Sequence, residues 1–219
     1  MQRFQLEARI LAHLRHQHIV WALDFGWERG VPFLVMEYAP GGTLQQAFPL
    51  GKALPISSIL PAVLQVASAL QFIHNNGVIH CDVKPGNVLL GPRDQVWLSD
   101  FGIASTVTSA SRTGYGRRAV PGTPCYLAPE RLHGQTLPAS DQYSLAVMVY
   151  QWLCGACPFE GSVHEICAHH QSTPPPRLQE RVPSIARVVE RVVLKALEKE
   201  PQKRFAHVQE FALALEQAS

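Results

Sequence analysis

The chain has 219 residues, enough for one large domain or two small ones, and its 47% hydrophobic content can fill a sizeable core. The 19 lysines and arginines nearly balance the 17 aspartates and glutamates, so the net charge is +2. This balance argues against a nucleic-acid partner and against binding to an anionic membrane surface. No uninterrupted apolar run of about 18 residues occurs, so we expect no membrane-spanning segment.

The five cysteines are odd in number and scattered, and Cys154 and Cys157 form the close pair. No second pair accompanies them, so zinc is not expected. The first residues lack the apolar core of a signal peptide. We therefore expect a reduced, cytoplasmic protein.

The first elements predicted along the chain are a helix, two strands, a loop and a long helix. Apolar residues recur near helical spacing over residues 3–15 and again over residues 56–75. Residues 19–23 and 32–36 are rich in β-branched and aromatic side chains, which predicts strands. Residues 37–42 contain a Pro-Gly-Gly sequence and predict a loop, which on its own is a plain linker.

Two short apolar segments, residues 77–79 and 88–90, predict strands on either side of a polar loop. That loop carries a base, a cation and an amide in Asp82, Lys84 and Asn87. Catalytic groups tend to lie on loops that a rigid scaffold holds, so the pattern favours an active site. Taken alone, the three are also ordinary loop residues.

The second half of the chain predicts a polar loop followed by helices. Residues 103–121 are rich in serine, threonine, glycine and arginine. Residues 140–153 are apolar nearly all round, which predicts a buried helix. Residues 184–199 have apolar side chains at amphipathic spacing. Shorter helices are predicted over residues 163–170 and 208–215.

Three motifs follow one another in a fixed order: the stretch 80–87, then Asp-Phe-Gly at 100–102, then Ala-Pro-Glu at 128–130. Each motif alone is weak, but together, at these spacings, they resemble the signature set of the protein kinase family. Lys84 with Asn87, and the threonine at Thr123, are similar to the serine/threonine branch. The sequences at residues 152–155 and 158–161 look most like those of bacterial serine/threonine kinases.

The resemblance implies an ATP- and Mg²⁺-dependent kinase that transfers the γ-phosphoryl group to serine or threonine hydroxyls of proteins. Such a reaction depends on alignment and charge neutralisation. Asp82 would orient the incoming hydroxyl and accept its proton, and Lys84 would stabilise the transferring phosphoryl group. Asn87 and Asp100 offer hard oxygen ligands for Mg²⁺.

The resemblance also assigns a nucleotide site to the loop after residue 36. Met36 would be the gatekeeper, next to a hinge between two lobes. Adenine would bond to the carbonyl of Glu37 and the N–H of Ala39, and Leu89 would form the floor beneath it.

Further residues have structural roles by resemblance. His80 and Phe101 would pack into the core, with His80 neutral and not a catalytic base. Asp141 can cap its own helix, and the resemblance adds that it holds the catalytic-loop backbone. Arg204 would form a buried pair with Glu130, although a surface arginine is the alternative.

Two features depart from the family pattern. Position 81 is Cys81 where most kinases have an arginine that binds a phosphate on the activation segment, and a thiol cannot replace a guanidinium in that role. The chain also begins too late for a Gly-rich loop and a lysine-bearing strand. Glu7 resembles the helix glutamate that pairs with that lysine. The chain is therefore expected to be a fragment; a genuine truncated scaffold, or parts supplied by another chain, are the alternatives.

The expected fold is α+β and kinase-like: a remnant small lobe over residues 1–38, a hinge over 39–43 and a mostly helical lobe over 44–219. The rival hypothesis is a catalytically inactive pseudokinase that binds partners. The intact Asp82, Lys84, Asn87 and Asp100 favour the enzyme, because a scaffold needs none of them.

We predict that residues 1–219 alone transfer no measurable phosphate and bind ATP weakly, because the phosphates lack a lid and a lysine. An apolar patch over Leu11 and Phe33 should make the protein prone to aggregation. ATP-dependent thermal shift and phosphate transfer to a basic substrate protein test this. Clear turnover by a soluble monomer, removed by Asp82→Asn, would contradict it.

Overall fold

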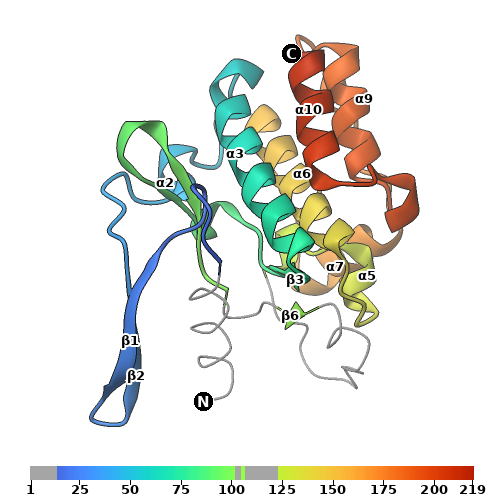
Figure 1. Cartoon of the computed structure of the whole chain (residues 1–219). Helices are drawn as coiled ribbons and strands as arrows, with labels where there is room; N and C mark the ends of the chain where they lie inside the picture. The colour runs from blue at the N-terminus through green and yellow to red at the C-terminus, as the bar shows by residue number, and fades with distance from the viewer. Residues whose placement is uncertain (1–13, 102–104, 107–122) are drawn as a thin grey trace.

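The computed structural model describes residues 14–101, 105–106 and 123–219. Four long helices pack against one another on one side of the molecule (Figure 1): α3 (Ile56–Asn75), α6 (Pro138–Cys154), α9 (Arg187–Ala196) and α10 (Val208–Ala218). The strands of the described residues form antiparallel pairs: β1 (Ala22–Glu28) with β2 (Val31–Met36), β3 (Val78–Ile79) with β6 (Ser105–Thr106), and β4 (Val88–Leu90) with β5 (Val96–Leu98). The predicted α+β class is confirmed.

Shorter elements connect these parts. They are α2 (Leu44–Ala47), α5 (Pro129–Leu132), α7 (Val163–Ser172) and α8 (Leu178–Arg181), with the 3₁₀ turns η1 (Pro85–Asn87), η2 (Pro92–Asp94), η3 (Pro124–Tyr126) and η4 (Pro201–Lys203). α2 begins with a capping box: the Gln46 amide donates to the Thr43 hydroxyl, and the Thr43 amide donates to the Gln46 side chain.

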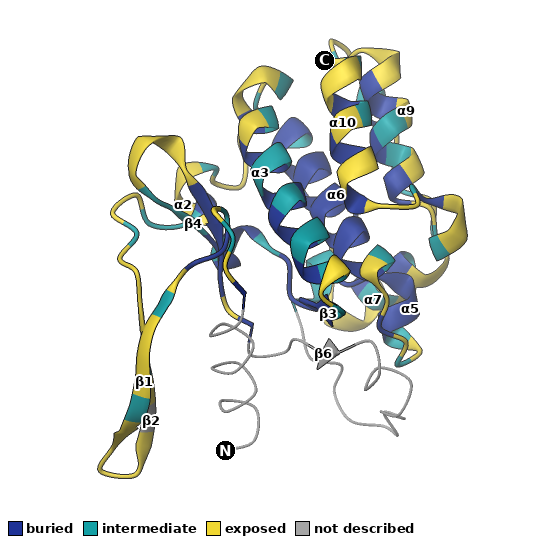
Figure 2. Cartoon of the chain, in the orientation of Figure 1, coloured by how far each residue is buried: buried dark blue, intermediate teal, exposed yellow. Residues whose placement is uncertain are grey.

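α6 runs through the centre of the helical lobe and is buried on all sides (Figure 2). Every residue from Ser140 to Leu153 is buried, as the apolar sequence predicted. The helix ends at Gly155, whose φ of 78° lies in the left-handed region. A Cβ at Gly155 would also lie 3.0 Å from the Lys52 amide nitrogen, so a larger residue would displace the neighbouring chain.

Among the described residues, α3 is the one helix that is long and apolar enough, by length and composition alone, to span a membrane. In the fold, its side chains Ile59, Val63, Leu70 and Ile73 are fully buried. The helix packs against α6, α10 and β5. The apolar composition of α3 is therefore explained by its place in the core of the helical lobe.

The first strand differs from its prediction over residues 19–23. Ile19 makes an isolated bridge to Leu98, and the Val20 amide donates to the Leu98 carbonyl at 3.0 Å. Ile19 and Val20 are buried there, so their β-branched side chains serve the contact with β5, and the strand begins only at Ala22. The helix predicted over residues 3–15 falls mostly outside the described residues, and residues 14 and 15 are not helical.

The β1–β2 hairpin extends away from the helical lobe and is largely exposed (Figures 1 and 2). It presents many large apolar side chains to solvent: Trp21, Leu23, Phe25, Trp27, Val31, Phe33 and Val35. Large apolar side chains exposed together on one hairpin favour association. The predicted exposure of Phe33 is therefore present, while Leu11 lies outside the described residues.

Arg204, directly after η4, forms a buried ion pair with Glu130 of α5. The Arg204 Nη1 and Nη2 atoms donate to Glu130 Oε1 and Oε2 at 2.8 and 2.7 Å, and both side chains are almost inaccessible. The remaining guanidinium N–H groups donate to the carbonyls of Glu198, Ala139 and Lys199. All five N–H donors of the arginine have an acceptor, so hydrogen bonds within the protein replace those that the buried charge would make with water.

We predict that Arg204→Ala lowers the free energy of unfolding by about 3–5 kcal/mol, because it leaves the buried Glu130 carboxylate without its partner. Lys203→Ala is the matched control: Lys203 pairs with Glu200 at the surface, where both side chains are more than half exposed. An exposed ion pair of this kind contributes little to the free energy of unfolding. Urea unfolding of both variants measures the difference, and equal effects would contradict the assignment.

Candidate active site

The loop between β3 and β4 gathers the three polar residues that the sequence singled out. Lys84 Nζ donates to Asp82 Oδ2 at 2.7 Å, and Asn87 Nδ2 donates to the same oxygen at 3.0 Å and to the Asp82 carbonyl at 2.9 Å. Asp82 and Asn87 are buried, while Lys84 is partly exposed. Asp82 Oδ1 accepts no bond from any residue that the structure describes, so one carboxylate oxygen is fixed and the other is available.

A second set of bonds ties the strand that ends at Asp100 to this loop. The Ser99 amide and hydroxyl both donate to the Asn87 carbonyl at 2.9 Å. His80 Nε2 donates to the Ser99 carbonyl at 2.9 Å. Asp100 follows with a φ of 62°, an uncommon left-handed conformation for a residue other than glycine. Ser99 thus sets the distance between Asn87 and the exposed Asp100.

His80 has the surroundings of a core histidine. Its Nδ1 accepts from the Asp82 amide at 3.3 Å while Nε2 donates, which is the pattern of the neutral tautomer. Its ring meets Phe101 edge to face, with centroids 4.8 Å apart. Both side chains are buried, so His80 supports the backbone of Asp82 and has no access to substrate.

Asp141, near the start of α6, accepts hydrogen bonds from the backbone of the loop between β3 and β4. Its Oδ2 accepts from the His80 amide at 2.9 Å and from His74 Nε2 at 2.8 Å, and its Oδ1 accepts from the Cys81 amide at 2.9 Å. Burial opposes ionisation of this carboxyl, but the bond and the charge of His74 and the Cys81 amide lower its pKa below the usual range. Asp141 therefore fixes the loop backbone from the centre of the helical lobe.

The residues proposed for adenine lie beside β4. The Gly41 amide donates to the Leu90 carbonyl at 2.9 Å, and the Leu90 amide donates to the Gly42 carbonyl at 2.8 Å. These bonds draw the segment after Ala39 against β4, on which Leu89 is half-buried. Met36 ends β2 and is 37% exposed, and the Glu37 amide donates to the Trp21 carbonyl.

Thr123 lies at the N-cap of η3, near the loop that carries Asp82. A small cavity beside Asp82 is lined by Thr123, Cys81 and Asp141, among others. Glu7 falls outside the described residues. Two further contributors, His74 and Ser99, were missed by the sequence reading, since neither belongs to a motif of its own and their partners are distant in the chain.

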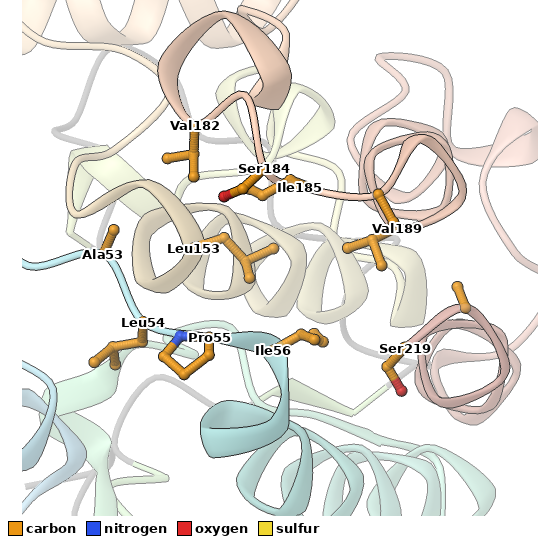
Figure 3. A pocket seen from close by; sticks show the side chains of 12 residues that line it. Ala53, Leu54, Pro55, Ile56, Leu153, Val182, Ser184, Ile185, Val189 and Ser219 are labelled. Carbon is orange, nitrogen blue, oxygen red and sulfur yellow. The ribbon is translucent and has the colours of Figure 1, made fainter.

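A larger apolar cavity lies elsewhere, between the start of α3, the end of α6, α9 and α10 (Figure 3). Its volume is about 460 Å³, and Leu54, Leu153 and Val189 are among its lining residues. None of the residues in the proposed catalytic loop reaches it.

The donor set at the loop fits a magnesium–nucleotide complex better than a metal bound by protein alone. In the described part of the chain, no three histidine, cysteine, aspartate or glutamate side chains cluster around a possible metal position. The Asn87 amide nitrogen is engaged by Asp82, which leaves its Oδ1 for a cation. One amide oxygen and the Asp100 carboxylate suit Mg²⁺, which takes its other ligands from water and phosphates.

We predict that Asp141→Asn lowers the free energy of unfolding by about 2–3 kcal/mol at neutral pH, because charge-assisted bonds to two amides and His74 are lost. The folded-state pKa lies below the unfolded value of about 3.9, so the charge stabilises the fold above pH 4. This contribution disappears as the pH falls through the folded-state pKa.

Urea unfolding between pH 3 and pH 7 measures the effect, with the exposed Asp94→Asn as control. A wild-type advantage over Asp141→Asn that grows as the pH is lowered would contradict the role of the ionised carboxylate.

Comparison with known proteins identifies the family. A model described as "Protein kinase domain" matches residues 1–214. The serine/threonine-protein kinase pkn3 of Myxococcus xanthus is 37% identical over 98% of this chain, and Pkn1 of the same organism is 35% identical over 100%. The serine/threonine-protein kinase PknB of Mycobacterium leprae is 37% identical over 93%.

The chain spans 41%, 32% and 33% of the length of these three relatives. The matched region includes the loop between β3 and β4, Asp100 and most of the helical lobe described above. The family uses ATP and Mg²⁺ and acts on proteins. On both grounds, this chain belongs to the protein kinase family, among the bacterial serine/threonine kinases.

Proposed function

We propose that the chain carries the catalytic part of an ATP-dependent serine/threonine protein kinase. The observation that carries the proposal is the arrangement of Asp82. Lys84 and Asn87 fix one of its carboxylate oxygens, and the loop backbone is held by Asp141. A preoriented carboxylate beside a cation is what phosphoryl transfer to a hydroxyl requires.

On the acceptor side, the free Asp82 oxygen orients a serine or threonine hydroxyl and accepts its proton as the oxygen attacks. Thr123 and Asp82 line one small cavity, so Thr123 would lie where a protein substrate approaches. Lys84 Nζ lies 2.7 Å from the other Asp82 oxygen, and its positive charge would offset the negative charge that spreads over the transferring phosphoryl group.

On the nucleotide side, we assign adenine to the backbone of Glu37 and Ala39, with Leu89 beneath it and Met36 as gatekeeper. The support is the hydrogen bonding that draws residues 41–42 onto β4. Asn87 and Asp100 would hold Mg²⁺, which would neutralise the negative charge of the phosphates. The Ser99 bonds keep these two ligands at a fixed separation.

The proposed lobes follow from this assignment: residues 1–38 form the small lobe, 39–43 the hinge and 44–219 the helical lobe. The resemblance of Glu7 to the glutamate that pairs with a lysine in kinases stays a prediction. Location in the cytoplasm stays a prediction. Cys81 lines the cavity beside Thr123 and offers no guanidinium there, so phosphorylation of that segment should activate weakly.

We predict that Asp82→Asn lowers the rate of phosphate transfer roughly 10²–10⁴-fold, because an amide cannot accept the proton of the hydroxyl. The test uses the chain extended at its N-terminus by a Gly-rich loop and a lysine-bearing strand, with ³²P transfer to a generic basic protein as readout. Asp94→Asn, an exposed aspartate on η2, is the matched control. An Asp82→Asn enzyme with a near-normal rate would rule out Asp82 as the base and favour a scaffold role.

A further inference from the structure

A groove with a volume of about 610 Å³ lies beside α8 and α9, and most of its lining residues are charged. Its basic residues are Arg177, Arg187, Arg191 and Lys195, all of them exposed, and its acidic residues are two glutamates. No residue of the loop between β3 and β4 lines this groove. It is therefore a candidate binding surface outside the proposed active site.

The arginines of this groove are not engaged by the protein itself. Among the residues that the structure describes, no ion pair or side-chain hydrogen bond involves Arg177, Arg187 or Arg191. Lys195 Nζ lies over the Phe205 ring, 4.2 Å from its centroid, and pairs with no carboxylate of the described residues. A guanidinium carries five N–H donors in a planar fork, so the three arginines keep these donors for an anionic partner.

The two glutamates of the groove leave it positively charged. Glu190 is buried, and its Oε1 accepts from the Gln179 amide at 3.0 Å, so this carboxylate serves the start of α8. The Gln179 side chain in turn donates to the Ile185 carbonyl at 2.9 Å, which fixes the floor of the groove. Glu198 lies just beyond the end of α9, is exposed, and accepts no side-chain hydrogen bond from the described residues. The groove thus combines unpaired cations with one unused acceptor.

The spacing of the basic residues on α9 selects the shape of a partner. Arg187, Arg191 and Lys195 follow one another at intervals of four residues, so they form a row along one side of the helix. Each step of that row is about 6 Å, because a helix rises about 1.5 Å per residue. An extended peptide advances about 6.6 Å over two residues, and side chains two apart lie on the same side of it. Acidic side chains at alternate positions of an extended segment therefore match the row.

We propose that this groove binds an extended acidic segment of a partner protein, in which aspartate or glutamate occupies every second position. Carboxylates of the segment pair with the guanidinium groups of Arg187 and Arg191, and Arg177 offers a third fork from the start of α8. Backbone N–H groups of the segment donate to Glu198. DNA fits less well, because its phosphodiester backbone has no donor for that carboxylate and no aromatic side chain lines the groove for bases to stack on.

Fluorescence anisotropy with labelled peptides tests the proposal without any kinase assay. The probe is a peptide of four Asp-Gly repeats, which we expect to bind the 219-residue protein saturably with a Kd below about 1 mM. A peptide with Asn in place of Asp should not bind, and one with the four aspartates contiguous should bind more weakly. The double variant Arg187→Gln, Arg191→Gln should weaken binding of the probe about tenfold. The matched control, Lys52→Gln with Arg93→Gln, removes the same charge from exposed positions outside the groove and should change the Kd less than about twofold.

The wild-type protein decides the matter even if a variant fails to fold. Absence of saturable binding up to about 1 mM, or equal affinity for the alternating and contiguous peptides, would overturn the proposal. So would equal weakening in the two double variants, or tighter binding of oligo-dT or of phosphatidylserine vesicles than of the peptide. The phosphate transfer rate of Asp82→Asn has no bearing on any of these results. The failure of the acidic-segment groove and the failure of the proposed kinase function are thus distinguishable.

Discussion

A buried carboxylate at the start of α6 is the constraint on which the site depends. Asp141 accepts the amides of His80 and Cys81, and Cys81 has a φ of 72°, which a residue other than glycine rarely adopts. Strain of this kind persists where the surroundings over-determine the backbone. Asp141 fixes the backbone of this loop, because it is itself held by His74 and by the fully buried helix on which it lies.

The same end of α6 organises the far side of the site. Ser140, the neighbour of Asp141, donates to Glu130, which also receives both branches of the Arg204 guanidinium. Glu130 lies in the first turn of α5, shortly after the segment that carries Thr123. The start of α6 therefore holds both the loop with the proposed base and the segment where an acceptor would dock. A rigid support of this kind suits a reaction whose rate depends on the alignment of the reacting groups.

The sequence was informative where a pattern was long or a motif was local. The periodicity of residues 56–75 predicted α3 to the residue, and the apolar run at 140–153 predicted a buried helix there. Four-residue helices such as α2, α5 and α8 contain too few residues to show a period. The first strand was misplaced because β-branched residues at Ile19 and Val20 favour extended structure whether they pair in a hairpin or only bridge to β5.

Contacts between distant residues were the part that sequence reasoning could not reach. The role of Asp141 followed from family resemblance, but its partner His74 carries no local signal. The apolar character of α3 was likewise ambiguous until α6 and α10 were seen to cover it.

Amide hydrogen exchange at His80 and Cys81 tests the central claim most directly. If Asp141 anchors the catalytic loop to the core, these two amides should exchange only through global unfolding, at the rate of core amides such as that of Leu98. In Asp141→Asn they should exchange orders of magnitude faster, while the Leu98 amide remains among the slowest in the variant. Rapid exchange of both amides in the wild-type protein, or no difference between the two proteins, would contradict the account.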